Sequence, residues 1–414
     1  MANPYRQLFA APGTRGFALA GLLARIPLPM TSIGIITMLA QLRGSYALAG
    51  AVSATFVLTY ALLSPQISRL VDRHGQRRVL PAATAISVMG MLIVLVSAWW
   101  HAADWTLFLG ALLTGFMPSM SAMVRARWTA IYRGQPRLQT AYSLETVFDE
   151  ATFIAGPPLA VGLSVAMFAQ AGLLAAAVLL ILGVFALLAQ RGSEPAVLNQ
   201  STATQNSKSV IGIANVRLLA LLMVAMGIIV GTVDIVSVAF AEQLDKPAAA
   251  SLVLSAYAGG SCLAGLLFGT LKLQMPLHRL LLLGSLATAA TTLPLLLAGS
   301  IATLAGAVLV AGLFFAPTMI VAMSLVERLV PEHQLTEGMT WLLAGLNVGV
   351  ALGAAASGQV VDSWNAPAGF YVALCAAALL LLVALCAYQR LRANDKAITG
   401  GCVIDVNALQ GFES

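Results

Sequence analysis

Three acidic residues stand close together in an otherwise apolar stretch, a pattern suited to binding and releasing protons. Glu145, Asp149 and Glu150 all fall between Thr140 and Val165. If this stretch is a helix, Glu145 and Asp149 lie on one face, because residues four apart are neighbours on a helix surface. Adjacent carboxylates repel one another, and burial favours the protonated form of the least compensated one. One of these acids is therefore a candidate for reversible protonation.

Arg25 lies in another apolar stretch at a matching depth. If both helices start in the cytoplasm, Arg25 lies about 14 Å along its helix, and Asp149 and Glu150 lie about 14 to 17 Å along theirs. An arginine keeps its proton, so it would hold one acid ionised and leave the other to titrate. We predict that Arg25 faces Asp149 or Glu150 and that the three form a proton-coupling site. The alternative is a static Arg–Asp pair that locks two helices together, with Glu150 merely hydrated.

The segment 68–80 concentrates charge in a chain that is only 9% charged, with four arginines and the single acid Asp72. Gly75 permits a tight reversal of the backbone. Asp72 can accept hydrogen bonds from the free N–H groups at the start of a neighbouring helix. Arg73 and Arg77 can bind carboxylates. We predict a gate, a contact that forms and breaks as the protein changes shape; the alternative is that the arginines only fix membrane topology.

The composition places these residues in a membrane protein. Hydrophobic residues make up 59% of the 414 positions, and the mean hydropathy is +0.90, which is more apolar surface than one soluble core can hide. A helix needs about 20 apolar residues to cross a bilayer. Twelve stretches qualify, over 16–40, 46–67, 79–100, 105–124, 140–165, 172–189, 216–241, 249–271, 280–298, 301–326, 338–361 and 369–388. The sequence predicts an all-α integral membrane protein with twelve transmembrane helices.

The cations predict the orientation of these helices. Of the 22 Lys and Arg residues, Arg25 lies within a helix and Arg43 and Lys246 lie in loops on one side. The other 19, including Arg78, fall on the side that holds both termini. Loops rich in Lys and Arg face the cytoplasm, so we predict that both termini are cytoplasmic. The net charge of +6 then reflects topology, and we expect no nucleic acid partner.

The chain also repeats itself. Residues 42–80 align without a gap on residues 244–282, which matches Ser53 with Ser255 and Arg77 with Arg279. This repeat predicts two pseudo-symmetric halves of six helices each. The predicted divisions are an N-terminal half over 1–190, a polar cytoplasmic linker over 191–214, a C-terminal half over 215–390 and a cytoplasmic tail over 391–414.

The charged segment resembles the signature that the major facilitator superfamily carries between its second and third helices, G-x-L-a-D-R-x-G-R-R. Ser68 replaces the first glycine and Gln76 replaces a basic residue. The resemblance covers essentially the whole chain, with twelve spans, duplicated halves and a central linker. The positions that match the signature are Asp72, Arg73, Gly75 and Arg77.

This resemblance implies partners for the gate and a lining for a central cavity. The gate would meet the start of the eleventh helix near Gly338. It would also meet charged groups at the cytoplasmic ends of the fourth and fifth helices, which are Arg125, Arg127 and Glu145. The predicted cavity residues lie on helices that line the cavity in the superfamily, although each could equally be ordinary packing. They are Met30, Met117, Met120, Asp234, Phe314, Phe315, Met319 and Trp341.

A second motif lies in the fifth predicted helix. The sequence "GPPLAVG" begins at Gly156 and resembles, loosely, the antiporter signature G-P-x-x-G-G. Gly156, Pro157 and Pro158 would kink the helix and allow close approach to the opposite half. The alternative is a common transmembrane Gly-Pro kink with no role in transport.

These features predict a proton-driven exporter of a moderately apolar small molecule, similar to the drug and sugar efflux branches of the superfamily. We expect a monomer in membrane lipid, in a bacterial inner membrane. An inward symporter or facilitator of the same fold is an alternative, as is a receptor or scaffold that has lost transport. We expect no enzyme activity, cofactor or metal site, since the four histidines are dispersed and no CxxC pair occurs.

Overall fold

Every regular element in the computed structural model is a helix, within residues 4–195, 209–246, 249–271 and 275–410, which the structure describes. Nine helical segments of this part are long and apolar enough to cross a membrane, and two shorter apolar helices accompany them. The remaining long helix, α8 (Arg137–Ala166), carries the acidic cluster. The predicted architecture of twelve membrane helices in two halves is confirmed.

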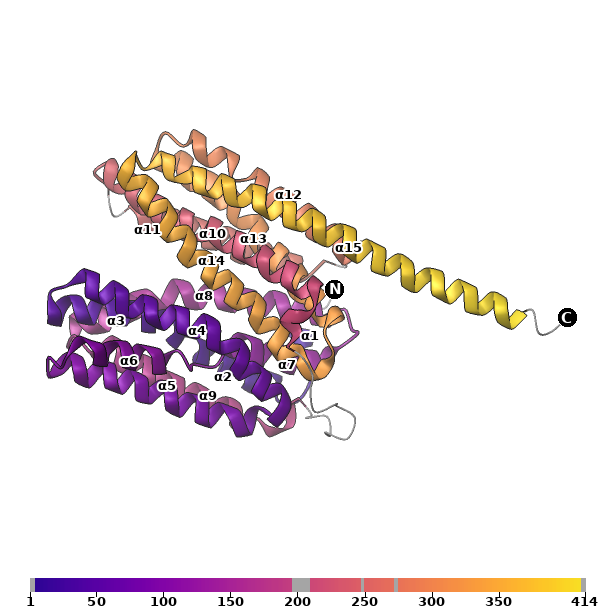
Figure 1. Cartoon of the computed structure of the whole chain (residues 1–414), viewed down its shortest axis with the longest axis horizontal. Coiled ribbons are helices and arrows are strands. Elements are labelled where there is room, and N and C mark those ends of the chain that lie inside the picture. Colours follow the sequence, from indigo (N-terminus) through magenta and orange to yellow (C-terminus); the bar gives the residue numbers. More distant parts are fainter. Residues whose placement is uncertain (1–3, 196–208, 247–248, 272–274, 411–414) are drawn as a thin grey trace.

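The two halves form separate groups of helices (Figure 1). The predicted linker contains η1 (Arg191–Ser193) and η2 (Val210–Gly212), and its residues 196–208 lie outside the described part. The N-terminal half contains α1 (Pro4–Leu8), α2 (Thr14–Arg25), α3 (Pro27–Arg43), α4 (Tyr46–His74), α5 (Gln76–Trp99), α6 (Asp104–Thr114), α7 (Met120–Tyr132), α8 and α9 (Ala171–Ala189). The C-terminal half contains α10 (Ala214–Gln243), α11 (Ala249–Phe268), α12 (Leu277–Ala290), η3 (Leu293–Leu297), α13 (Ile301–Leu329), η4 (Glu332–Gln334), α14 (Leu335–Ser363), η5 (Pro367–Gly369) and α15 (Phe370–Gln410).

Two of the predicted helices are interrupted. The first is divided into α2 and α3 at Ile26, immediately before Pro27. The fourth is divided into α6 and α7, with Pro118 in the non-helical segment between them. Proline lacks the N–H group that continues a helix. After its break the fourth helix continues to Tyr132, beyond its predicted end at Val124, so two arginines that the sequence assigned to a loop lie within α7.

Small residues allow the helices of the C-terminal half to pack closely. A Cβ atom added to Gly231 of α10 would lie 2.1 Å from the carbonyl oxygen of Val350 in α14, and one added to Gly349 would lie 2.1 Å from the carbonyl oxygen of Val224. Such contacts are shorter than van der Waals distance, so only glycine fits. Backbone approach through small residues is a common basis of helix association in membranes.

Gly156 also lies at a close helix contact, although not the predicted one. A Cβ atom at this position would lie 2.7 Å from Cγ of Pro29 in α3, which belongs to the same half. The prediction that Gly156 approaches the opposite half is therefore wrong, because this face of α8 packs within its own half. The helix α8 continues through Pro157 and Pro158, and the predicted kink stays a prediction.

The end of the molecule that carries the α4–α5 turn, the α7–α8 turn and both linker helices is called the linker end here. In Figure 1 the ribbons of the two halves converge near α1 and α7 at this end and diverge toward the opposite end. Arg133 joins the halves there through Glu327, at 3.1 Å, and Glu332, at 3.0 Å. The Tyr5 hydroxyl donates to the Leu266 carbonyl at 2.5 Å. Burial raises the pKa of Tyr5 to about 12, so this donor keeps its proton at neutral pH.

Candidate functional site

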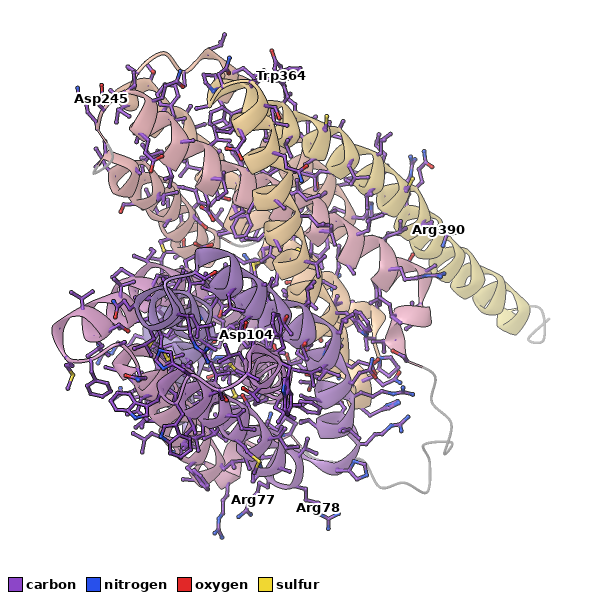
Figure 2. All side chains as sticks on the ribbon, turned by 60° about the vertical axis from the view of Figure 1, so that its left-hand side comes forward. Arg77, Arg78, Asp104, Asp245, Trp364 and Arg390 are labelled. Carbon is purple, nitrogen blue, oxygen red and sulfur yellow. The ribbon has the colours of Figure 1, made fainter. Side chains whose placement is uncertain are left out.

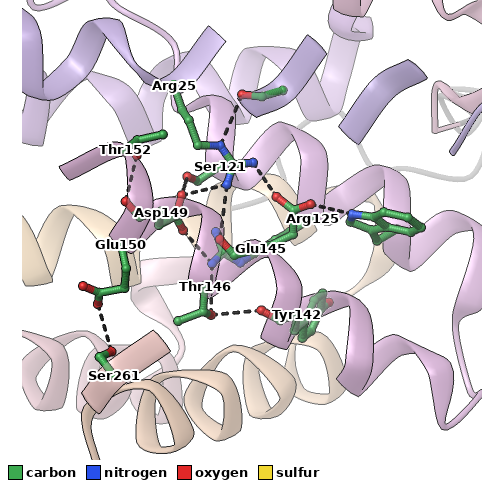
Figure 3. Close-up of polar contacts among 12 residues, drawn as sticks. Arg25, Ser121, Arg125, Tyr142, Glu145, Thr146, Asp149, Glu150, Thr152 and Ser261 are labelled. Atoms are coloured by element: carbon green, nitrogen blue, oxygen red, sulfur yellow. Dashed lines mark hydrogen bonds and ion pairs between the residues drawn. The ribbon is translucent and has the colours of Figure 1, made fainter. Parts of the chain in front are cut away.

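Arg25 binds two of the acidic residues of α8. It is the last residue of α2 and is 4% exposed. Its Nη1 atom donates to Oδ1 of Asp149 at 2.9 Å, and its Nη2 atom forms an ion pair with Glu145. Figure 3 shows the guanidinium between these two carboxylates. The predicted contact between Arg25 and Asp149 is confirmed, and Glu145 is a second partner that the sequence placed elsewhere.

A second arginine, Arg125, completes this cluster. It is fully buried, and its Nη2 atom donates to Oδ2 of Asp149 at 2.7 Å. The Ser121 hydroxyl donates to the other oxygen of the same carboxylate. The sequence assigned Arg125 to the cytoplasmic gate, and the structure corrects this because the restarted helix α7 carries its side chain into the N-terminal half. A signal was available, since Arg125 follows the predicted helix end by one residue.

Glu145 lies in the same cluster instead of at the gate. Its Oε1 atom accepts a hydrogen bond from Nε1 of Trp128 at 2.7 Å, and the side chain is fully buried. Residues four apart lie on one face of a helix, so the side chains of Glu145 and Asp149 both point toward α2 and α7. The cluster of Arg25, Arg125, Glu145 and Asp149 thus pairs two cations with two acids and has no net charge.

Glu150 faces away from this cluster. Its Oε1 atom accepts a hydrogen bond from the Ser261 hydroxyl of α11 at 3.2 Å, which joins the two halves (Figure 3). Among the described residues Glu150 forms no ion pair. Successive helix residues point about 100° apart, so Asp149 and Glu150 cannot both face Arg25. The structure therefore divides the predicted trio and leaves Glu150 without a cation.

Asp234 is the other acid of the membrane region that has no ion pair among the described residues. It lies on α10 and is partly exposed. Tyr257 of α11 lies one helical turn before Ser261, the hydrogen-bond partner of Glu150. The Tyr257 ring packs against Phe315, with 6.0 Å between ring centroids. Glu150, Ser261 and Tyr257 thus lie along the contact between α8 and α11, and Asp234 lies on the neighbouring helix α10.

The predicted gate contact at Asp72 is present. Its two carboxylate oxygens accept hydrogen bonds from the backbone N–H groups of Thr336, at 3.3 Å, and Glu337, at 2.8 Å. These groups belong to the first turn of α14, whose free N–H groups favour an anion. Gly75 ends α4 with φ at 86°, which permits the predicted reversal. Asp72 therefore fastens the two halves together at the linker end, and its role as a gate stays a prediction.

Glu337 is a residue of this contact that the sequence analysis missed. It is 1% exposed and lies 3.8 Å from Arg69 of α4. Its Oε1 atom accepts hydrogen bonds from the Ser209 hydroxyl and from the Val210 N–H group at 3.2 Å. Glu337 thus joins α14 to α4 and to the end of the linker. Its place immediately before Gly338, in the segment that Asp72 was expected to meet, was an available signal.

None of the four arginines of the gate segment is fully buried, and Arg69 is partly exposed. Arg73, Arg77 and Arg78 are exposed, and Figure 2 shows Arg77 and Arg78 projecting from the surface. The backbone N–H group of Arg77 donates to Glu194 at 3.0 Å, so the contact with a carboxylate is made by backbone and not by the guanidinium.

Arg127 is buried at the linker end, where the resemblance placed it. Its Nε atom donates to Gln76 at 2.8 Å, and its Nη1 atom donates to Ser193 at 2.8 Å and to the Gln190 carbonyl at 2.9 Å. Gln76, which replaces a basic residue of the signature, therefore binds an arginine. Arg127 joins the gate segment to the start of the linker and not to the opposite half.

Most of the predicted cavity residues are packed inside the helix bundle. Met30 packs with Ala160 and Ala176, between α3, α8 and α9. Phe314 and Trp341 are partly exposed. For five of the predicted residues, the prediction that they line an open cavity is wrong in this conformation, because their side chains point toward neighbouring helices. Those residues, each at most 5% exposed, are Met30, Met117, Met120, Phe315 and Met319.

Replacing Asp72 with asparagine should slow transport and leave the fold intact. Asparagine has one amide oxygen for the two N–H groups of α14 and turns a donor toward one of them, which destabilises the closed linker end by about 1 to 3 kcal/mol. We expect turnover in proteoliposomes to fall severalfold while the melting temperature stays close to that of the original protein. Asp245→Asn, at an exposed loop position, is the matched control. Unchanged turnover in Asp72→Asn would remove the gate from the mechanism.

Comparisons with known proteins agree with this geometry. The model of the family described as Major Facilitator Superfamily matches residues 17–244 and 217–404. A bacterial homologue of the iron transporter ferroportin, in an outward-facing state, is 18% identical with a TM-score of 0.70 and covers 92% of this chain and 100% of its own. The E. coli fucose:proton symporter FucP is 13% identical with a TM-score of 0.68, and the match covers 90% of this chain and 98% of FucP. The human organic anion transporter MFSD10 is 15% identical with a TM-score of 0.67, and the match covers 91% of this chain and 100% of MFSD10. A search of curated protein sequences gave no match.

Proposed function

This chain belongs to the major facilitator superfamily, and from this premise we propose that it exports a moderately apolar small molecule in exchange for protons. The family and the fold establish a multi-pass membrane protein that carries small molecules by alternating access and is not an enzyme. The proposal adds the coupling ion, the direction and the character of the substrate. It also assigns the protein to a bacterial inner membrane with the linker end in the cytoplasm.

The observation that carries the proposal is that Glu150 forms no ion pair with any cation of the described chain. Arg25 and Arg125 are both bound to Asp149. The charges of this cluster are therefore balanced without the binding of a proton. Glu150 instead contacts Ser261 of the other half at 3.2 Å. A carboxyl group that lies in the membrane without a cation is costly in its charged form, and it can reduce that cost by taking a proton. We therefore assign proton coupling to Glu150.

The contacts between the halves support alternating access with the linker end closed. Asp72 and Glu337 join α4 to α14, and Arg133 joins α7 to the segment around Glu332. When the halves rock in the opposite direction, these contacts must break. The contact between Glu150 and Ser261 also crosses between the halves, so movement of α8 relative to α11 changes the surroundings of the coupling acid. A carboxyl group whose surroundings differ between two conformations can bind a proton more tightly in one of them.

The direct test is transport by purified protein in proteoliposomes, with imposed pH gradients of either sign and a panel of radiolabelled small molecules. We expect accumulation only when substrate and protons move in opposite directions. Accumulation with protons moving in the same direction would show a symporter and contradict export by antiport. Saturable binding with no flux under any gradient would favour a receptor or scaffold.

A further inference from the structure

We propose that a second, uncharged latch closes the linker end, in which Tyr5, Gln139 and Thr140 of the N-terminal half bind the carbonyl end of α11. Tyr5 lies on α1, Gln139 and Thr140 lie at the start of α8, and α11 belongs to the C-terminal half. This second latch acts together with the contact between Asp72 and α14. The inference goes beyond the proposed function, because it depends on alternating access alone and not on the coupling ion, the direction or the substrate.

The end of α11 receives hydrogen bonds from side chains of the opposite half. The last carbonyl groups of a helix have no partner within that helix, so they need donors from elsewhere. Three carbonyl groups at this end each accept a side-chain hydrogen bond. The pairs are Tyr5 to Leu266 at 2.5 Å, Gln139 to Phe268 at 2.7 Å and Thr140 to Gly269 at 2.7 Å. Every donor is a hydroxyl or an amide, so the second latch contains no ion pair.

The two halves approach each other closely at Gly269. A Cβ atom added to this residue would lie 2.5 Å from the hydroxyl oxygen of Tyr5 and 2.6 Å from Cβ of Ser143 in α8. Real Cβ atoms do not approach other atoms so closely, and Ser143 is fixed on its helix. Glycine at this position therefore lets the end of α11 come near enough for the three hydrogen bonds.

The short helix α1 is anchored to the N-terminal half. The Tyr132 hydroxyl of α7 donates to the Leu8 carbonyl at 2.7 Å, and the Leu8 side chain is fully buried. Tyr5 therefore moves with the N-terminal half, whereas its acceptor Leu266 moves with the other half. A rocking movement that opens the linker end must break this hydrogen bond.

The sequence repeat makes the second latch the counterpart of the Asp72 contact. The helix α11 corresponds to α4 in the repeat, and α8 aligns with α14 when Gly156 is laid on Gly353. Gln139 and Thr140 then fall on the two residues of α14 whose N–H groups bind Asp72. The repeat has a glutamine at the position of Asp72, so the charge of the first contact has no counterpart. In the second latch the donors of α8 reach the carbonyl groups of α11 instead.

The two latches stabilise the same closed conformation through different pairs of helices. One joins α4 to α14 and the other joins α8 to α11. Opening of the linker end breaks both, so each contributes to the free energy of the closed state. Weakening the second latch must therefore increase opening at the distant Asp72 contact.

The test is hydrogen–deuterium exchange of the purified full-length protein in lipid nanodiscs, followed by mass spectrometry. The backbone N–H groups of Thr336 and Glu337 lie in the first turn of α14 and have no acceptor within the helix. Asp72 protects them, so their exchange reports opening of the linker end. In Tyr5→Phe we expect this exchange to be about fivefold faster, which corresponds to about 1 kcal/mol. In Gly269→Ala, whose methyl group separates α11 from α8, the increase should be at least as large.

Matched controls exist at exposed positions of the same chain. Tyr371→Phe and Gln243→Ala remove the same kinds of donor where the side chains are exposed, and they should leave the exchange at α14 unchanged. Gln139→Ala removes a different donor of the second latch. It should also raise the exchange about fivefold, and it serves if Tyr5→Phe fails to fold.

Three results would each overturn the inference. The first is unchanged exchange at the start of α14 in the variants of the second latch. The second is faster exchange confined to α1 and α11, which would show a local anchor with no part in closure. The third is an equal increase at the opposite end of the molecule, around Trp364, which would show general destabilisation.

The result is separable from the proposed function, because the test uses no substrate and no proton gradient. Faster exchange at α14 in a protein that moves no protons would support the second latch and contradict antiport. Proton-driven export with unchanged exchange at α14 would support the transport function and overturn the second latch.

Discussion

Replacing Arg25 with methionine should lower the free energy of unfolding by about 3 to 5 kcal/mol, because removal of one partner strands a buried charge. The stranded group is Glu145, which is fully buried. Asp149 retains Arg125 at 2.7 Å, so it loses less. Methionine is close in length to the aliphatic part of arginine, which limits any cavity. The apparent melting temperature in detergent and the yield of monodisperse protein should both fall clearly.

A second substitution tests the physical reason for this loss. In the Arg25→Met background, Glu145→Gln should restore at least half of the lost stability, because it removes the stranded charge. Glu150→Gln in the same background should restore none, because Glu150 contacts Ser261 and not Arg25. Arg15→Met, at an exposed position in the same helix, is the control. Equal rescue by the two carboxyl substitutions would contradict the described cluster.

Replacing Glu150 with glutamine should abolish accumulation driven by a pH gradient while the protein folds normally. The amide imitates the protonated carboxyl group and needs no cation, so little stability should be lost. Without a group that binds and releases the proton, the gradient no longer drives transport, and the initial rate of accumulation should fall at least about a hundredfold, or about 2.7 kcal/mol. Exchange of labelled for unlabelled substrate at saturating concentration should persist, since it requires no net proton movement. Full gradient-driven accumulation in this variant would show that Glu150 is not the coupling acid.

The adjacent residue gives the sharpest comparison. Asp149→Asn should mainly lower stability, because it leaves Arg125 and Arg25 with one carboxylate, Glu145, between them. Folding yield should therefore fall in Asp149→Asn and remain high in Glu150→Gln. The opposite result would place the coupling acid in the arginine cluster.

Several features could be predicted from the sequence because they depend on position along a helix. Twelve apolar stretches of sufficient length predicted the membrane helices, and the charged segment predicted the contact between Asp72 and the start of α14. The equal depth of Arg25 and Asp149 followed from the constant rise of a helix, about 1.5 Å per residue. Depth in the membrane is a property of each helix alone, so it can be calculated without knowing the neighbours.

The direction in which each side chain points around its helix axis was decided only by the tertiary structure. Asp149 and Glu150 are adjacent in the chain, yet one binds two arginines and the other contacts the opposite half. Arg125 lies in the cluster because α7 continues past the predicted helix end and its side chain meets Asp149 of α8. Packing likewise turned Met30 into the core. Each residue rotates the side chain by about 100°, so which face meets which neighbour depends on how the helices pack, and the sequence of a single helix does not contain that information.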